Sequence, residues 1–288
     1  MTVPEMYDWH FSNNRDHPVF VYSTETDTVT LSYSTVVPAI HEAGKLAESL
    51  LGADMPKVPL QCSPIAIISS ADTITFFCTI LGILRCGIPV FPISPRNTSG
   101  AIAHLLRSTG VKHILAGQEA VLNTLLQEVI QKLHLDTPDY PLPSISAMPV
   151  FEDLFNDSTS PNSVNRIYGS SYDPQSTFLH LPAIFVHSSG STSHPKPIPW
   201  SHASILQVAM SPQYSAYDLR GEIFGAHQLA MAHPSGLNYL AWVAGIGMIM
   251  AVFPPRSPAT IPTPANVIDG LKSCKATFII CVPSFPEV

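Results

Sequence analysis

Hydrophobic and polar positions in the first half of this chain switch repeatedly between the period of a strand and that of a helix. Ser63–Ser70 is a short run rich in isoleucine, and the apolar stretch after Asp72 has the length of a helix and stops at Gly87. The order then repeats, with strands predicted at Ile88–Ile93 and Val111–Ala116 and helices predicted at Thr98–Gly110 and Gln118–Leu133. Strands and helices in alternation favour parallel β-α-β units, so the sequence predicts an α/β fold.

The alternation breaks down between Asp136 and Ser176. This segment is rich in proline, serine, asparagine and aspartate, which is typical of a long surface connection or linker. Strand and helix signals return beyond it, with strands predicted at Pro182–His187 and near Ile223–Met231, a helix at Ser201–Met210 and a last βα pattern that ends in Lys275–Val288. The sequence contains no internal repeat at a fixed period.

One uncharged segment, Leu237–Pro255, raises the question of a membrane span. A spanning helix needs about 20 consecutive apolar residues, whereas this run is interrupted by Gly245 and Gly247 and stopped by Pro254 and Pro255. A buried helix followed by a buried strand accounts for the pattern better. We therefore expect no membrane partner.

Composition narrows the classes of partner. Hydrophobic residues make up 45% of the chain and charged residues only 12%, about half the ~25% usual in soluble domains. Much of the surface must then be neutral or covered. The net charge of −7 supplies no basic field for a phosphate backbone, so nucleic acid is excluded as a partner. Any phosphate binding must be local.

Cysteine usage and the N-terminus favour a cytoplasmic location. The cysteines are odd in number and contain no C-x-x-C pair, which argues against a disulfide framework and against a zinc knuckle. Asp8, Arg15 and Asp16 lie where a signal peptide would need an apolar stretch. The five cysteines are Cys62, Cys78, Cys86, Cys274 and Cys281.

The most informative stretch follows the strand predicted at Ala183–Val186. Gly190 lies among five hydroxyl residues there, and Lys196 follows them. Backbone N–H groups in such a turn form an anion nest, to which hydroxyls and one lysine add hydrogen bonds and charge. A serine-rich surface turn is the alternative. The mononucleotide-binding pattern G-x-x-x-x-G-K-[ST] is excluded, because there is no second glycine before Lys196 and no hydroxyl residue after it.

Other candidate sites are weaker. His180, His187 and His194 recur every seven residues, but they cross a predicted strand and loop and share no face, so they do not have metal-ligand spacing. His227 and His233 are equally poor as a metal pair. A serine hydrolase would carry G-x-S-x-G, which does not occur. Two aromatic residues of the first half, Tyr33 and Phe91, are expected in the core.

The run Ser188–Lys196 closely resembles the phosphate-loop signature of the adenylate-forming superfamily, which includes acyl-CoA synthetases, luciferases and the adenylation domains of nonribosomal peptide synthetases. That signature is an apolar strand followed by S/T-S/T-G-S/T-T-G/S-x-P-K, and Ser193 occupies the position where many members have a second glycine. Further segments agree in order. They are Val29–Leu50 with Tyr33, Ile67–Thr98, and Gln228–Leu237, while Phe253–Val288 is similar to one branch, the fungal carboxylic acid reductases that resemble nonribosomal peptide synthetases.

The resemblance implies that a carboxylic acid reacts with ATP to give an acyl-adenylate and pyrophosphate. It implies a small carboxylic acid as substrate, ATP and Mg²⁺ as cofactors, and, in further domains, phosphopantetheine and NADPH for thioester transfer and reduction. His233 and Gly236 would border the acyl pocket. The residues implied to hold the β and γ phosphates are Ser188, Ser189, Gly190, Ser191, Thr192, Ser193 and Lys196.

The family's adenine-binding Y-G-x-T-E motif, its ribose-binding aspartate, its hinge and its C-terminal lysine have no counterpart before Val288. We therefore expect residues 1–288 to be a partial N-terminal adenylation domain, without lid, carrier and reductase domains and without an assignable catalytic residue. Such a chain would be inactive alone and would self-associate through uncovered apolar surface. The alternative is a noncatalytic remnant that binds nucleotide weakly or packs on a partner protein. The particular acid is not determined by these residues.

Overall fold

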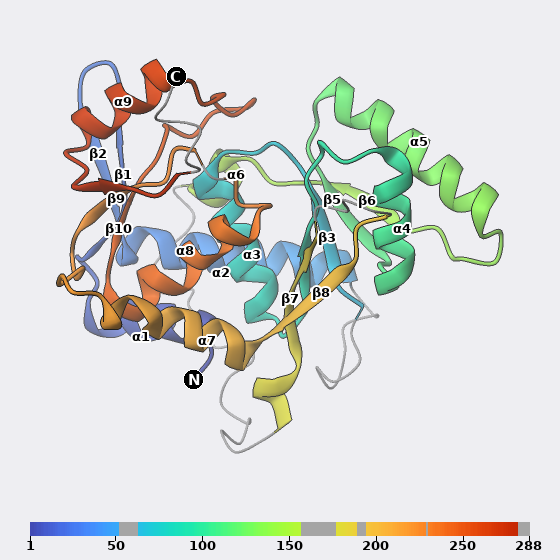
Figure 1. The fold of residues 1–288 in the computed structure, drawn as a ribbon, viewed down its shortest axis with the longest axis horizontal. Helices are drawn as coiled ribbons and strands as arrows, with labels where there is room; N and C mark the ends of the chain where they lie inside the picture. The colour runs from blue at the N-terminus through green and yellow to red at the C-terminus, as the bar shows by residue number, and fades with distance from the viewer. Residues whose placement is uncertain (52–62, 157–176, 189–193, 229, 282–288) are drawn as a thin grey trace.

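A computed structural model describes residues 1–51, 63–156, 177–188, 194–228 and 230–281. Two β-sheets lie on either side of a central group of helices (Figure 1). The first sheet has the order β6-β5-β3-β4-β7-β8 and the second the order β11-β9-β10-β1-β2. Pairing is parallel except at one edge of each sheet, where β8 lies antiparallel to β7 and β2 antiparallel to β1. The α/β fold class with parallel sheets is thereby confirmed.

The strands are short. The six-stranded sheet consists of β3 (Ile65–Ile68), β4 (Val90–Pro92), β5 (His113–Ala116), β6 (Ser144–Ala147), β7 (Pro182–His187) and β8 (Pro197–Ser201). The five-stranded sheet consists of β1 (Pro18–Ser23), β2 (Thr28–Ser32), β9 (Ile223–Gly225), β10 (Ile249–Ala251) and β11 (Phe278–Ile279).

The helices form layers around these sheets. Helices α2, α3 and α8 lie between the two sheets, whereas α4 and α5 cover the far side of the six-stranded sheet (Figure 1). The helices are α1 (Val3–Asn13), α2 (Tyr33–Leu51), α3 (Thr73–Arg85), α4 (Ser99–Thr109), α5 (Ala120–Asp136), α6 (Phe151–Leu154), α7 (His202–Met210), α8 (Pro234–Ile246) and α9 (Pro264–Ser273), with short 3-10 helices η4 (Thr177–His180) and η5 (Ser211–Tyr214).

Local sequence signals explain where several helices begin and end. Asp72 is the N-cap of α3, and its carboxylate accepts a hydrogen bond from the Thr75 amide at 3.0 Å. Thr98 caps α4 in the same way, and Gly110 ends that helix in the left-handed conformation that favours glycine. Ser201 caps α7. These ends agree with the sequence predictions.

Helix α3 is buried on all sides, because it packs against sheets and helices at once. Every residue from Ile74 to Arg85 is buried. The main hydrophobic core contains side chains from both sheets and from the helices between them, and a second core lies under α4 and α5. Tyr33 and Phe91 are both fully buried, which confirms the prediction that they are core residues.

Some sequence predictions were wrong in detail. The segment 136–176, predicted as a long surface connection or linker, contains β6 and α6, and its residues 157–176 lie outside the described part. Strand β6 pairs in parallel with β5, whose edge supplies hydrogen-bond partners for its backbone. The proline-rich sequence around β6 does not predict this strand. Strand β9 is shorter than predicted. The hydrophobic pattern did not predict α1, α2, β1, β2 or β8.

The apolar segment Leu237–Pro255 forms the buried helix and strand that its glycines and prolines predicted. Helix α8 ends at Gly247, which has a φ of 70°, and β10 follows directly. Among the described helices, none has the length and apolar character needed to cross a bilayer.

Two helices approach each other closely at a glycine. A Cβ atom added to Gly82 of α3 would lie 2.6 Å from the Gly44 nitrogen, 2.7 Å from the Ala43 Cβ and 2.7 Å from the Ile40 oxygen, all in α2. Two of these three atoms belong to the α2 backbone, so relieving the clash would require the helices to move apart. Replacement Gly82→Ala is therefore expected to lower the free energy of unfolding by about 1–3 kcal/mol. The control Gly100→Ala, where only a lysine side chain lies nearby, should be neutral or stabilising by up to about 1 kcal/mol in denaturant titrations.

A buried charge network joins α1, α2 and α3. The Asp8 carboxylate lies 2.6 Å from His41 Nε2, and the Arg85 guanidinium donates to it at 3.2 Å. Burial alone would raise the pKa of Asp8, but the hydrogen bond from His41 and the charge of Arg85 outweigh it and hold the pKa below its usual range. The side chains of His41 and Arg85 are almost fully buried, at 3% and 7% exposure.

The lowered pKa of Asp8 sets the direction of a pH effect. A carboxyl whose folded pKa is depressed contributes stability above its unfolded pKa, and this contribution is lost as pH falls through the folded value. At pH 7, Asp8→Asn should lower the free energy of unfolding by about 1–3 kcal/mol. This loss is smaller than usual for a broken buried ion pair, because Asp8 is partly exposed. This loss of unfolding free energy should shrink toward zero as the pH falls through the folded pKa of Asp8. If Asp8→Asn and the exposed control Asp16→Asn unfold alike at pH 7, the network does not stabilise the fold.

Candidate phosphate-binding site

The two ends of the predicted phosphate loop meet in an antiparallel pair. Strand β7 runs into the loop and β8 runs out of it, with His187 paired to Pro197. Beyond that pair, the Ser188 amide donates to the Lys196 carbonyl at 3.1 Å, and the Lys196 amide donates to Ser188 Oγ at 3.0 Å. We call these two residues the neck of the loop. Ser189–Ser193 lie outside the described residues.

The neck lies where the topology of a parallel sheet favours a ligand. Strand β7 pairs in parallel with β4, and the neck follows the carboxyl end of β7. In open α/β sheets, ligands bind beyond the carboxyl ends of the strands. The chain also leaves the carboxyl end of β4 here, so the segment around Asn97 and the start of α4 reach the same edge.

Side chains from that neighbouring segment contact the neck. Asn97 Nδ2 lies 3.4 Å from His187 Nε2, and the His187 ring packs edge-on against Phe91. The His104 ring of α4 stacks on the His194 ring, with centroids 5.0 Å apart and planes 19° apart. No local pattern predicted these contacts of Asn97 and His104, because both residues lie some 90 positions from their partners in the chain.

The electrostatics of the neck are locally positive in a chain of net charge −7. Lys196 is exposed and forms no ion pair with any described residue. Burial, the His194 ring and the Arg107 guanidinium together lower the pKa of His104 from its usual value. The Lys196 ammonium is thus a cation available to a phosphate.

His233 and Gly236 lie at the start of α8, between strands β9 and β10 of the five-stranded sheet in chain order. The His233 side chain caps the helix, since Nδ1 accepts a hydrogen bond from the Ser235 amide at 3.2 Å, and its ring is exposed. Gly236 is buried, and a Cβ there would lie 2.4 Å from the Ala230 oxygen. Among the described residues, no hydrogen bond links His233 to the neck, so their shared role remains a prediction.

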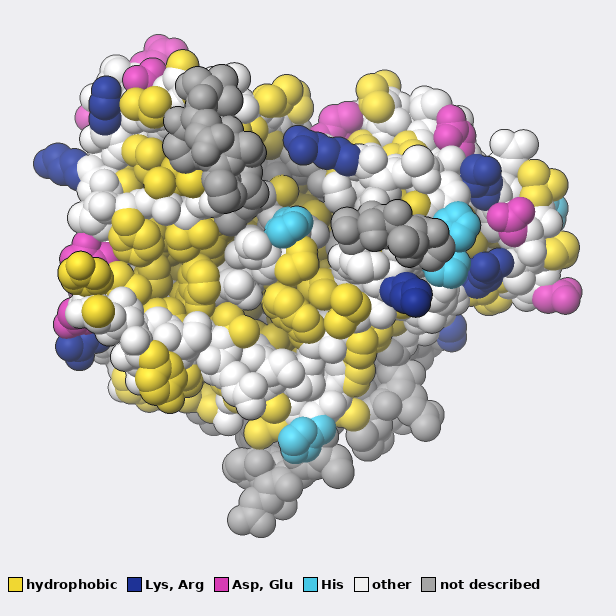
Figure 2. All heavy atoms as spheres, viewed as in Figure 1, with side chains coloured by type: hydrophobic (Ala, Val, Ile, Leu, Met, Phe, Trp, Pro, Cys, Tyr) yellow, Lys and Arg dark blue, Asp and Glu magenta, His cyan; other side chains and the backbone are white. Residues whose placement is uncertain are grey.

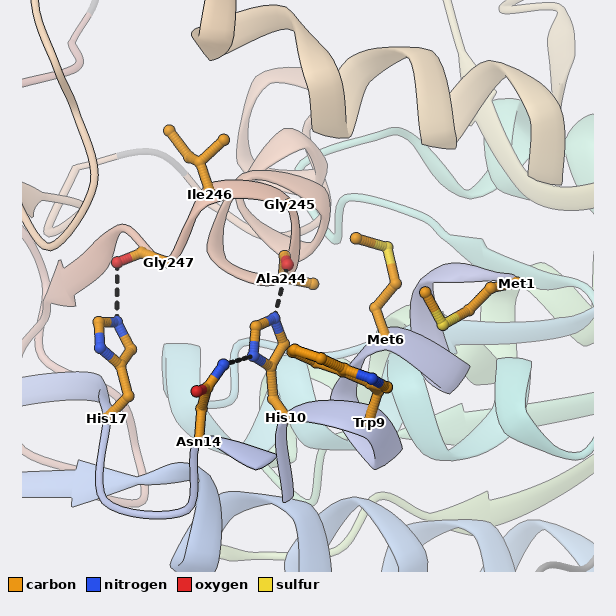
Figure 3. A pocket seen from close by; sticks show the side chains of 10 residues that line it. All are labelled: Met1, Met6, Trp9, His10, Asn14, His17, Ala244, Gly245, Ile246 and Gly247. Atoms are coloured by element: carbon orange, nitrogen blue, oxygen red, sulfur yellow. Dashed lines mark hydrogen bonds between the residues drawn. The ribbon is translucent and has the colours of Figure 1, made fainter. Parts of the chain in front are cut away.

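A pocket of about 390 Å³ lies at the opposite end of α8, against α1 (Figure 3). There the His10 ring donates to the Ala244 carbonyl at 2.8 Å and the His17 ring donates to the Gly247 carbonyl at 2.9 Å. These bonds satisfy carbonyl groups at the C-terminal end of α8. Because His233 caps the other end of this 13-residue helix, about 20 Å away, this pocket is separate from the predicted acid site.

No metal centre is present among the described residues, and the face shown in Figure 2 carries no broad charged patch. No group of three or more His, Cys, Asp or Glu residues there could hold a metal ion. Hydrophobic side chains spread across the middle of the face in Figure 2, over α8 and beside β7 and β8, while charged side chains lie mainly around its margins. Anion binding at the neck therefore depends on a few local groups.

Comparison with known proteins places this fold and loop in a family. The family model described as AMP-binding enzyme matches residues 7–287, so the chain belongs to the family of AMP-binding enzymes. Among solved structures, the N-terminal domain of FACL13 from Mycobacterium tuberculosis has a TM-score of 0.71 at 17% identity, covering 99% of this chain and 64% of that one. A luciferase-like enzyme from Zophobas morio has a TM-score of 0.70 at 17% identity, covering 99% of this chain and 59% of that one. These likenesses show the fold.

More specific similarity is to fungal adenylate-forming reductases, as the sequence analysis predicted. The adenylate-forming reductase Nps10 of Heterobasidion annosum is 34% identical over 293 residues, covering 100% of this chain and 26% of the relative. The adenylate-forming reductase stbB of Stachybotrys bisbyi is 26% identical over 295 residues, covering 98% of this chain and 25% of the relative. The chain thus spans about a quarter of the length of the curated relatives it matches.

Proposed function

We propose that this chain carries the phosphate-binding part of an adenylation domain that activates a small carboxylic acid with ATP. The observation that supports this most directly is the neck, where paired hydrogen bonds join Ser188 to Lys196 and leave the lysine ammonium without an ion pair among the described residues. Membership of the AMP-binding family and similarity to adenylate-forming reductases support the same proposal.

In the proposed reaction, a carboxylate oxygen attacks the α-phosphorus of ATP. A new acyl–phosphate bond forms, the bond between the α-phosphorus and the bridging oxygen breaks, and pyrophosphate leaves with its electrons. Charge therefore accumulates on the leaving group. A fixed ammonium and preorganised donors stabilise such charge better than mobile water does. Lys196 supplies the charge, and Ser188 keeps an O–H for the phosphate because its oxygen accepts the Lys196 amide.

The residues between the two ends of the neck complete the proposed phosphate site. By the family pattern, Ser189, Gly190, Ser191, Thr192 and Ser193 add hydroxyl and backbone N–H donors to the β and γ phosphates. Mg²⁺ has no protein cage among the described residues. It would enter with ATP, since magnesium at phosphate sites uses few protein ligands beside the phosphate oxygens. No residue is assigned as an acid or base.

The proposed acid site lies at the start of α8. His233, which is exposed at the N-cap, and the buried Gly236 would border the acyl group. Thioester transfer to a phosphopantetheine arm and reduction with NADPH are proposed for the complete natural protein, by similarity to the reductases, and not for residues 1–288.

Loss of the loop's donors is expected to slow adenylation. In the complete natural protein that contains this chain, Thr192→Ala and Lys196→Ala should each lower acid-dependent exchange of labelled pyrophosphate into ATP by roughly 10²-fold, the loss seen for single oxyanion-type donors. The melting temperature of Lys196→Ala should barely change, because Lys196 is exposed and contributes little to the core. A panel of aryl and aliphatic acids identifies the substrate first.

A simple serine-rich turn predicts the opposite result. Near-normal exchange in both variants would remove the phosphate-site assignment. Thr192 is the sharper probe, because added salt screens any general electrostatic effect of Lys196 but not a lost hydroxyl contact. Arg220→Ala is a suitable control, since Arg220 is an exposed cation paired only with Asp218 among the described residues.

A further inference from the structure

The stack of His104 on His194 connects α4 to the outgoing side of the neck. His104 lies in the middle of α4, a helix capped at both ends by Thr98 and Gly110. Its ring lies nearly parallel to the His194 ring at a centroid distance of 5.0 Å. Because α4 packs on the six-stranded sheet through a buried face, His104 presents its ring from a rigid support.

Only one residue separates His194 from Lys196, and that residue is rigid. Pro195 is buried, and its ring fixes its own φ near −65°. Proline also restricts the preceding residue to extended conformations, so His194 has little freedom of its own. Fixing the His194 ring therefore fixes the direction in which the chain reaches Lys196.

On the incoming side, Asn97 contacts His187, and Asn97 lies two residues before α4 begins. Both sides of the neck are thus held by one structural unit, the Asn97 turn together with α4. The neck's own hydrogen bonds join Ser188 to Lys196 but do not attach either residue to the rest of the fold. The sheet pairing of β7 and β8 attaches the neck through the backbone. The contacts of His187 and His194 add side-chain attachments to the Asn97 turn and to α4.

We propose that His104 is a positioning residue for the phosphate site, holding Lys196 in place through the stacked ring of His194 and the buried Pro195. This inference rests on the proposed function. The aromatic face of the ring performs the role, because the contact is a stack of two nearly parallel rings. His104 does not touch the phosphate.

The test compares side chains that keep or lose the stack, in the complete natural protein at one fixed pH. His104→Leu keeps the bulk of the side chain but removes the aromatic face, whereas His104→Phe keeps that face and cannot be protonated. An aromatic pair contributes between about twofold and tenfold to an equilibrium constant. We expect His104→Leu to weaken ATP binding in calorimetry by that factor and His104→Phe to restore it.

Two further measurements separate positioning from general stability. The control His134→Leu alters an exposed histidine of α5 and should leave ATP affinity and melting temperature unchanged. In NMR spectra, the His194 ring protons should shift in His104→Leu through loss of the neighbouring ring current and remain near their wild-type positions in His104→Phe.

The outcomes distinguish this inference from the proposed function. If Lys196→Ala weakens ATP binding while His104→Leu binds like the wild type, the positioning role is wrong and the phosphate site stands. The positioning role is also wrong if His104→Phe binds as weakly as His104→Leu. If Lys196→Ala leaves ATP affinity unchanged, the proposed phosphate site itself fails.

Discussion

The close crossing of α2 and α3 is the constraint on which the rest of this structure depends. Both helices lie between the two sheets (Figure 1), so neither can move outward without displacing strands. Gly82 permits the contact, since a Cβ there would collide with the α2 backbone. The thiol of Cys86 donates to the Gly44 carbonyl at 3.3 Å one turn further along α3. Close packing at this point sets the spacing of the sheets and of the edges where the loops emerge.

The order of strands in the six-stranded sheet explains why one helix supports both sides of the neck. Strand β4 lies between β3 and β7. The chain that leaves the carboxyl end of β4 therefore passes beside the carboxyl end of β7, where it forms the Asn97 turn and then α4. The proposed phosphate site is assembled from the connections that follow two neighbouring parallel strands, β4 and β7. Ligand sites in open α/β sheets usually lie beyond the carboxyl ends of such strands.

The fold persists among relatives with little sequence identity, because it depends mainly on the pattern of apolar positions. At 17% identity the solved structures retain TM-scores of 0.70 and 0.71. Cores tolerate many hydrophobic replacements as long as volume and pattern are kept. The buried strand β3 and the wholly buried helix α3 show that pattern here, since their burial requires apolar residues but not particular ones.

The sequence by itself determined the elements whose signals are local. Asp72 and Gly110 mark helix ends because capping involves neighbours within one turn, and the phosphate-loop pattern is readable because its residues are consecutive. Only the tertiary structure decided the rest. Strand β6 exists because the edge of β5 offers partners across the sheet, and His104 meets His194 because α4 follows the strand next to β7. Such contacts join residues far apart in the chain, and no local spacing encodes them.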